Sequence, residues 1–223
     1  MSAASAGKGD GLDESSKRRA AEPTVRVNGV PVWQGFLSPA AQVEVLGAVM
    51  AIADAAPFVR PVTPSGRQMS VEMTSAGELG WVTDRNGYRY EPRHPTGVGW
   101  PPIPDPILGI WRDVSGVSRP PTSCLVNLYR EGARMGLHQD RDEGDFSWPV
   151  VSVSLGDEAL FRVGGTVRRG RTESLWLKSG DIAVLSGETR LAFHGIDRVR
   201  AGSSRLVPGG GRINLTMRVV DKE

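Results

Sequence analysis

Apolar positions come in short alternating runs near the start of the chain and then change to a helical spacing. The segment 25–36 has apolar runs on both sides of Asn28-Gly29, a dipeptide typical of two-residue turns, and predicts a hairpin. Ser38-Pro39 is a helix start, with Ser as N-cap and Pro in the first turn. The three-to-four spacing that follows predicts a helix to near Ala55, whose buried face comprises Val43, Leu46, Val49, Met50 and Ile52.

The rest of the chain divides into a Gly- and Pro-rich stretch and a series of short apolar runs. Residues 57–121 predict an irregular lid with strand-like pieces at 69–73 and 88–90 and a short helix at 106–114. After them, short strands are predicted at 123–129, 134–138, 150–155, 159–163, 174–177, 181–185, 190–193 and 212–219. Strands in this number and of this length are typical of a double-sheet jelly roll.

We therefore expect a mostly β fold with flanking helices. Residues 1–22 are polar, without aromatic or β-branched residues, and are expected to be a disordered tail. Residues 23–223 are expected to form a single domain, with the lid at about 57–121 and the jelly-roll core at about 122–220. Within it, the Gly-rich segment 199–211 is expected to order only on binding.

Composition narrows the class of protein. A single cysteine, Cys124, excludes an intramolecular disulfide and a cysteine-based zinc cluster. No apolar run is long enough to span a membrane and no secretory leader is visible, so we expect a cytoplasmic protein without membrane contact. Between Arg162 and Arg218 there are eleven Lys or Arg and four Asp or Glu. This surplus favours a polyanionic partner, although a solvated surface explains it equally well.

The few histidines suggest a metal site. Of the three, His138 stands two residues before Asp140, so on extended backbone both side chains share a face, which Asp142 continues. With the distal His194, two histidines and one carboxylate form the facial triad of non-haem Fe(II) oxygenases. The alternative is a surface histidine beside acids that cap a turn. His94 has no partner motif and is expected in a surface loop.

The last strand alternates strictly between apolar and polar residues. One face carries Ile213, Leu215, Met217 and Val219, and the other carries Arg212, Asn214, Thr216 and Arg218. Guanidinium groups donate paired hydrogen bonds to carboxylates, so the polar face suits a dicarboxylate, although a half-solvated strand has the same pattern. Asn127 and Tyr129 share a face of an earlier predicted strand and add an amide and a phenol.

These motifs together resemble one family. Its motifs occur in order as Met73-Thr74, Leu79-Gly80-Trp81, the segment 86–90, Trp100-Pro101, Asn127-Leu128-Tyr129, the segments 138–143 and 151–156, Gly180-Asp181, the segment 187–190, His194-Gly195-Ile196 and the strand 212–218. From about residue 25 to 220, the chain is similar to the AlkB family of Fe(II)- and 2-oxoglutarate-dependent nucleic-acid dealkylases, of the bacterial type. The family fold is a double-stranded β-helix.

The resemblance implies cofactors and roles for individual residues. The cofactors would be Fe(II), 2-oxoglutarate and O₂. Fe(II) would bind His138, Asp140 and His194, and 2-oxoglutarate would bind Asn127, Tyr129, Arg212, Asn214 and Arg218. In the substrate site, Trp81 would stack on an extruded base, Tyr88 and Tyr90 would flank the nucleotide, Asp142 would lie at the base edge, and Arg168 would lie near the lip.

The implied activity is oxidative DNA repair. A monomer would remove alkyl groups from N1-methyladenine and N3-methylcytosine in single- or double-stranded DNA, releasing formaldehyde, succinate and CO₂. An RNA or tRNA dealkylase with the same site is one alternative, because no motif here reports on the 2′-hydroxyl. A non-catalytic nucleic-acid-binding homologue is another, and the intact triad and arginine strand argue against it.

Overall fold

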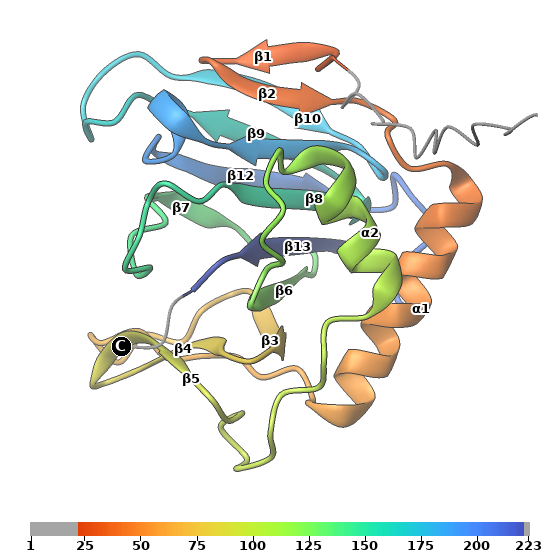
Figure 1. Cartoon of the computed structure of the whole chain (residues 1–223), viewed down its shortest axis with the longest axis vertical. Helices are drawn as coiled ribbons and strands as arrows, with labels where there is room; N and C mark the ends of the chain where they lie inside the picture. The colour runs from red at the N-terminus through yellow and green to blue at the C-terminus, as the bar shows by residue number, and fades with distance from the viewer. Residues whose placement is uncertain (1–21, 221–223) are drawn as a thin grey trace, which may run out of the picture.

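Two facing β-sheets form the centre of the molecule (Figure 1), a computed structural model that describes residues 22–220. In spatial order, the larger, seven-stranded sheet comprises β1 (Val25–Val27), β2 (Val30–Trp33), β11 (Ile182–Leu185), β8 (Val150–Gly156), β13 (Arg212–Arg218), β6 (Ser123–Tyr129) and β3 (Glu72–Gly77). The smaller, four-stranded sheet comprises β10 (Glu173–Leu177), β9 (Glu158–Val163), β12 (His194–Arg200) and β7 (Met135–His138).

The sheets enclose one core, and the helices cover a second. Apolar side chains between the sheets include Leu125 from β6 and Phe161 from β9. On the other face of the larger sheet, Ile213 and Leu215 of β13 pack in one cluster with the helices α1 (Pro39–Ala55) and α2 (Asp105–Val114). The helices lie together on the right of Figure 1. This is the double-stranded β-helix, or jelly roll, that the strand pattern predicted.

The first helix begins where the sequence predicted. Ser38 accepts a hydrogen bond from the Ala41 amide, and Pro39 occupies the first turn, as the pattern indicated. The buried stripe is different, because Val45, Leu46, Val49 and Ile52 face the sheet. The expected core positions Val43 and Met50 are 61% and 40% exposed, since they lie on the far side of this stripe.

The Gly- and Pro-rich stretch contributes one strand to the larger sheet and also forms a separate hairpin. β3 pairs along its length with β6 and so belongs to the larger sheet. Two further strands, β4 (Gly80–Asp84) and β5 (Gly87–Glu91), pair only with each other among the described residues. This β4–β5 hairpin lies at the lower left of Figure 1.

Two further sequence-based expectations are wrong, those for residues 190–193 and for His94. Residues 190–193 form no strand: a short 3₁₀ helix (η1, Gly187–Thr189) and a turn precede β12, which begins at His194. His94 is buried, with its ring nitrogens hydrogen-bonded to Thr96 and to the Pro57 carbonyl. The Gly-rich segment 199–211 contacts Asp157, which accepts hydrogen bonds from the amides of Ser204 and Gly211.

Two further points concern the limits of the described chain. The expected disordered tail, residues 1–22, lies outside the described residues except for Glu22. Among residues 22–220, no helix combines the length and the apolar character needed to cross a membrane.

Candidate functional site

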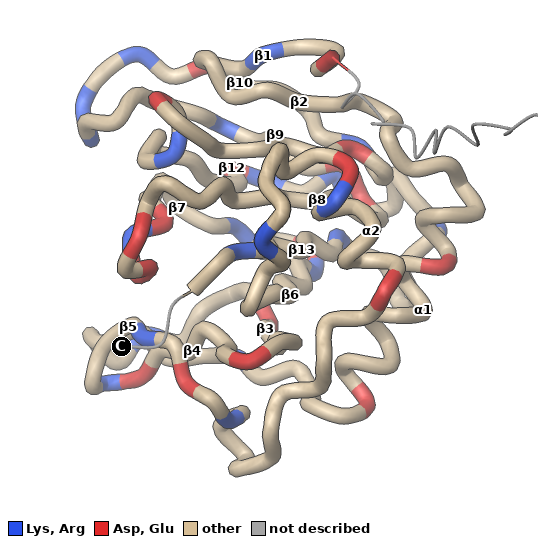
Figure 2. The backbone as a smooth tube through the Cα atoms, viewed as in Figure 1, with Lys and Arg blue, Asp and Glu red and all other residues tan. Residues whose placement is uncertain are grey.

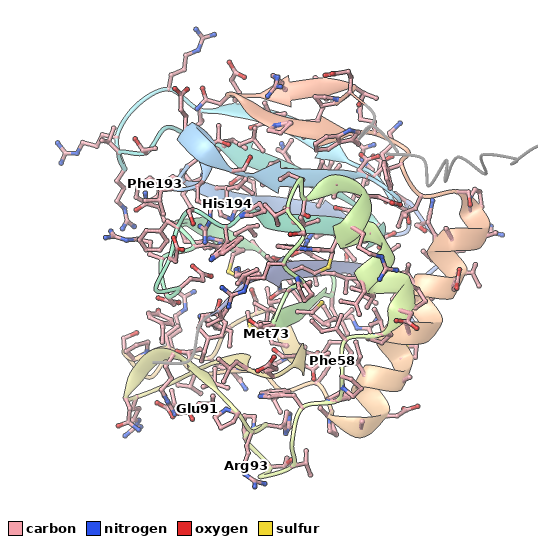
Figure 3. The ribbon with its side chains drawn as sticks, in the orientation of Figure 1. Phe58, Met73, Glu91, Arg93, Phe193 and His194 are labelled. Atoms are coloured by element: carbon pink, nitrogen blue, oxygen red, sulfur yellow. The ribbon has the colours of Figure 1, made fainter. Side chains whose placement is uncertain are left out.

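Strand pairing brings the two distant histidines together. His194 on β12 stands directly opposite His138 on β7, and their ring centroids are 4.6 Å apart. Gly195 permits this approach, because a Cβ there would lie 2.6 Å from the Met135 carbonyl oxygen. Asp140 follows the end of β7, and one potential ligand atom from each of the three residues lies within 4.8 Å of the others. Figure 3 labels His194 at this position on β12.

The hydrogen bonds of both rings leave the same nitrogen available for a metal. Nδ1 of His138 lies 2.9 Å from the Gly136 carbonyl, and Nδ1 of His194 lies 3.0 Å from the Ala192 carbonyl. Since a carbonyl only accepts, each Nδ1 carries the proton and each Nε2 keeps its lone pair. The Nε2 atoms lie 3.7 and 3.8 Å from the Asp140 carboxylate. This is a metal-binding tautomer.

The charge states also suit a cation. Burial lowers the pKa of His194 to about 4, so the ring is neutral near pH 7. Burial alone would raise the pKa of Asp140, but the positive charge of Arg218 above all lowers it below its usual range. The carboxylate is therefore ionised, and Arg218 lies 2.8 Å from its Oδ2. An anionic carboxylate beside two histidines matches the donor set of a facial triad.

The polar face of β13 lies beside the triad. The strand pairs Arg212 with Tyr129 and Asn214 with Asn127 on β6, so these side chains lie in two cross-strand pairs. All four are at least nine-tenths buried. The Arg212 guanidinium lies over the Tyr129 ring at 5.2 Å and donates to the Ser154 hydroxyl. Burial raises the pKa of Tyr129, so its phenol remains protonated and can donate.

Several polar atoms in this cluster lack protein partners. Among the described residues, Nε and one terminal nitrogen of Arg212 and one terminal nitrogen of Arg218 are buried without a hydrogen bond. Buried polar atoms are nearly always paired, so this cluster fits an acid that supplies carboxylate oxygens. It opens into a cavity of about 290 Å³ that the three triad residues also line. The triad and this polar cluster therefore line the same cavity.

The β4–β5 hairpin supplies aromatic side chains to the same cavity. Trp81, Tyr88 and Tyr90 line it, and the rings of Trp81 and Tyr88 stack at 5.6 Å with an angle of 20°. Nε1 of Trp81 donates to Oδ2 of Asp142 at 2.7 Å. Asp142 and Tyr88 are exposed, so this part of the cavity lies toward solvent. The wall from β3 includes Met73, labelled in Figure 3.

Glu143 connects the hairpin to the metal site. Its buried carboxylate accepts from the Tyr90 hydroxyl at 2.7 Å and pairs with Arg218 at 3.0 Å and with Arg190 at 3.1 Å. Arg190 also donates to the backbone carbonyl of Asp140. Burial raises the pKa of Tyr90, so the phenol keeps the proton that it donates to Glu143. A continuous polar network thus joins the hairpin, β13 and the loop that carries Asp140.

Comparison with known proteins is consistent with this geometry. Residues 29–218 match the profile of the 2OG-Fe(II) oxygenase superfamily. Over 199 residues, the chain is 56% identical to an alpha-ketoglutarate-dependent dioxygenase AlkB homolog of Caulobacter vibrioides, a match that covers 89% of this chain and 90% of the relative. The chain belongs to the AlkB family. It is a 2-oxoglutarate- and Fe(II)-dependent dioxygenase that uses O₂.

Other AlkB-family proteins support the assignment. The chain is 43% identical over 177 residues to the alpha-ketoglutarate-dependent dioxygenase AlkB of Escherichia coli, covering 77% of this chain and 82% of that one. The solved structure of OsALKBH1 superimposes with a TM-score of 0.75 at 30% identity, covering 89% of this chain and 99% of that one. The fold therefore agrees with the family.

The AlkB-family site contains most of the residues that the sequence singled out, and some that it did not. All of the residues assigned to iron, to 2-oxoglutarate or to substrate line the cavity, except Arg168. Arg168 is exposed on the loop between β9 and β10. Sequence reasoning gave no role to Glu143 or Arg190. Glu143 closes the 138–143 motif and Arg190 closes the 187–190 motif, so the resemblance offered a signal for both residues.

Proposed function

We propose that this dioxygenase repairs alkylated DNA, removing methyl groups from N1-methyladenine and N3-methylcytosine. The observation that carries the proposal is the aromatic and acidic group of Trp81, Tyr88 and Asp142 in the cavity that also contains the triad. A flat indole beside a carboxylate fits a flat, positively charged base. The names of the bacterial relatives, AlkB and AlkB homolog, support the same family of reactions.

The chain's own residues would hold the cofactors and the substrate. His138, Asp140 and His194 would bind Fe(II) through the two free Nε2 atoms and one carboxylate oxygen. The residues that would bind 2-oxoglutarate are Asn127, Tyr129, Arg212, Asn214 and Arg218. Bound Fe(II), with 2-oxoglutarate and O₂, supplies the oxidation that hydroxylates the methyl carbon and yields succinate and CO₂. The hydroxylated carbon then leaves the ring nitrogen as formaldehyde.

The substrate side would select for the cationic lesion. Alkylation of the pairing edge weakens the base pair, so such a base is easier to extrude from the stack. Trp81 would stack on the extruded base, which is worth about 1–3 kcal/mol per base. The Asp142 carboxylate would attract the positive charge, and Tyr88 and Tyr90 would flank the nucleotide. With a base bound, the cavity would keep bulk water from the reacting carbon.

A single reaction tests this proposal. The enzyme is loaded with Fe(II) and 2-oxoglutarate without oxygen, then exposed to air with an N1-methyladenine DNA oligonucleotide and with its RNA counterpart. We expect each DNA strand to lose one methylene in mass, with formaldehyde and succinate released, and His138→Ala to abolish turnover. Preferred turnover of RNA would replace the DNA assignment with an RNA dealkylase. Iron binding without any mass change would point to another substrate, and no iron binding would contradict the triad.

A further inference from the structure

The outer face of the smaller sheet carries an aromatic and basic patch away from the cavity. Trp176 on β10 is half-buried, and the guanidinium carbons of Arg200 and Arg198 on β12 lie 4.3 and 5.8 Å from its ring centroid. Trp176 pairs with Leu160, which lies on β9 between β10 and β12. The two arginines therefore reach across β9 on the solvent side. We call these three residues, Trp176, Arg198 and Arg200, the tryptophan–arginine patch.

The inward-facing neighbours of these residues establish which side the patch occupies. Phe161 and Leu177 alternate with Leu160 and Trp176 along their strands and are buried in the core between the sheets. The patch side chains thus point away from that core. Arg198 and Arg200 are exposed, and Arg200 keeps a 55% exposed side chain although it pairs with Glu158 at 2.6 Å. Ion pairs this exposed contribute little, so a phosphate can replace Glu158.

A groove connects this face with the cavity. It is lined by three further arginines, Arg67, Arg134 and Arg162, which we call the arginine groove. Met69, Met135 and Ile196 line both the groove and the cavity. Arg162 is the link to the patch, because it lies on β9 on the same face as Leu160.

Charge along this route is predominantly positive. The arginine groove and the patch contribute five arginines, and the acids that pair with them are Asp197 and Glu158. Figure 2 shows blue positions along β9 and β12 and along the loop between β9 and β10. Guanidinium groups interleaved with an aromatic ring suit single-stranded nucleic acid, because phosphates pair with the charges and bases stack on the planar groups.

We propose that the arginine groove and the tryptophan–arginine patch bind the single-stranded nucleic acid that flanks the target nucleotide. The strand would leave the cavity past Met135, follow the groove around the β7 edge, and contact Trp176 with a base and Arg198 and Arg200 with phosphates. This inference rests on the proposed function, since the partner is the remainder of the substrate strand. The inference predicts that the affinity of the enzyme for its substrate depends on the length of the strand.

The test compares a methylated trinucleotide with a methylated single strand of about twelve nucleotides, a length within the range that one binding groove covers. The variants are Trp176→Leu, Arg198→Gln and the double variant Arg198→Gln/Arg200→Gln. The control is Arg112→Gln, an exposed arginine on α2, which covers the other sheet. Thermal unfolding of each variant is measured first to confirm that it folds. Arg198→Gln is included because it removes no ion pair of the described structure. Binding of an unmodified strand of the same length is measured by fluorescence anisotropy at several salt concentrations.

The wild-type enzyme should have the lower KM for the longer strand. Trp176→Leu and the double variant should raise that KM by about tenfold, with kcat and all trinucleotide parameters unchanged. The double variant should reduce the salt dependence, the slope of log K against log salt, by about 1.4 for two lost phosphate contacts. Equal KM values for both lengths in the wild type, an equal effect of Arg112→Gln, or a loss that includes the trinucleotide would each overturn the proposal.

The outcomes also separate this inference from the proposed function. If no substrate is demethylated but the patch variants weaken binding of the unmodified strand, the repair function is wrong and the surface assignment stands. If both substrates are demethylated equally well by all variants, the repair function stands and the surface assignment is wrong.

Discussion

The indole nitrogen of Trp81 lies 2.7 Å from Oδ2 of Asp142, so the β4–β5 hairpin is joined to the loop after β7. A cationic base that enters the cavity would compete for this carboxylate. A neutral base has no charge with which to replace the indole N–H. Binding of a cationic base would therefore change the contacts of Trp81, the proposed stacking group, and of Asp142, the proposed charge-recognising group, together.

Substitution of Trp81 separates stacking from this hydrogen bond. Trp81→Phe keeps a ring and loses the N–H, so we expect it to retain most of its demethylation rate, because Asp142 is exposed and water can replace the lost donor. Trp81→Ala should lower kcat/KM for a methylated oligonucleotide by about tenfold or more, the value of one lost stack. The 2-oxoglutarate turnover measured without nucleic acid should remain. Normal repair by Trp81→Ala would show that the stacking assignment is wrong.

Arg212 offers a direct test of the acid site. It is 1% exposed and has two nitrogen atoms without a hydrogen bond among the described residues. Arg212→Ala should raise the KM for 2-oxoglutarate by roughly ten- to a hundredfold, as expected for lost hydrogen bonds to a charged group. Arg212→Lys should restore little of this, because one ammonium cannot replace a planar fork.

The controls for Arg212 are nucleic-acid affinity and a surface arginine. Oligonucleotide binding should change much less than the KM for 2-oxoglutarate, and Arg26→Ala, at an exposed position on β1, should change neither quantity. An unchanged KM for 2-oxoglutarate in Arg212→Ala would remove this residue from the acid site.

Arg190 is expected to stabilise the loop that carries Asp140. Its buried guanidinium donates to the carbonyls of Trp148 and Asp140 and pairs with Glu143. Arg190→Met leaves these groups short of a partner, so we expect a loss of about 3–5 kcal/mol in the free energy of unfolding. Urea unfolding monitors this, with the exposed Arg169→Met as the matched control, expected within about 0.5 kcal/mol of wild type. Equal stability of both variants would contradict a structural role for the buried pair.

The site could be predicted where its residues follow a strand period. Alternation along 212–218 separated Arg212 and Asn214 from Ile213 and Leu215, because a buried strand with two different faces must alternate. His138 and Asp140 are also two residues apart and do meet at one site, although β7 ends at His138 and Asp140 lies beyond the strand. Such patterns depend only on neighbours in sequence, because successive side chains of a strand point to opposite faces.

The features that the sequence did not predict depend on contacts between distant segments of the chain. The run 190–193 has the composition of a strand, yet Arg190 donates to the Asp140 carbonyl and pairs with Glu143. Strand pairing with β7 begins only at His194. His94 lies in a Pro-rich stretch without any period, and its burial comes from the Pro57 carbonyl and the Trp100 ring. Neither partner can be deduced from the local sequence.

Asp157 determines the order of the Gly-rich segment that precedes β13. Its 2%-exposed carboxylate accepts from the amides of Gly202, Ser204 and Gly211 and from the Ser203 hydroxyl. Asp157→Asn replaces one acceptor oxygen with an N–H donor that faces backbone donors. Because unpaired buried donors are costly, the free energy of unfolding should fall by about 1–3 kcal/mol.

The same change should be visible in the loop and in the site. Trypsin should cleave after the exposed Arg205 faster in Asp157→Asn than in the wild type, whereas Glu44→Gln on the exposed side of α1 should leave the rate unchanged. Arg212 follows Gly211 directly, so a displaced Gly211 moves the start of β13 and should raise the KM for 2-oxoglutarate as well. Wild-type stability, cleavage rate and KM in Asp157→Asn would mean that the segment is held by other contacts, such as the hydrogen bond from Arg130 to the Pro208 carbonyl.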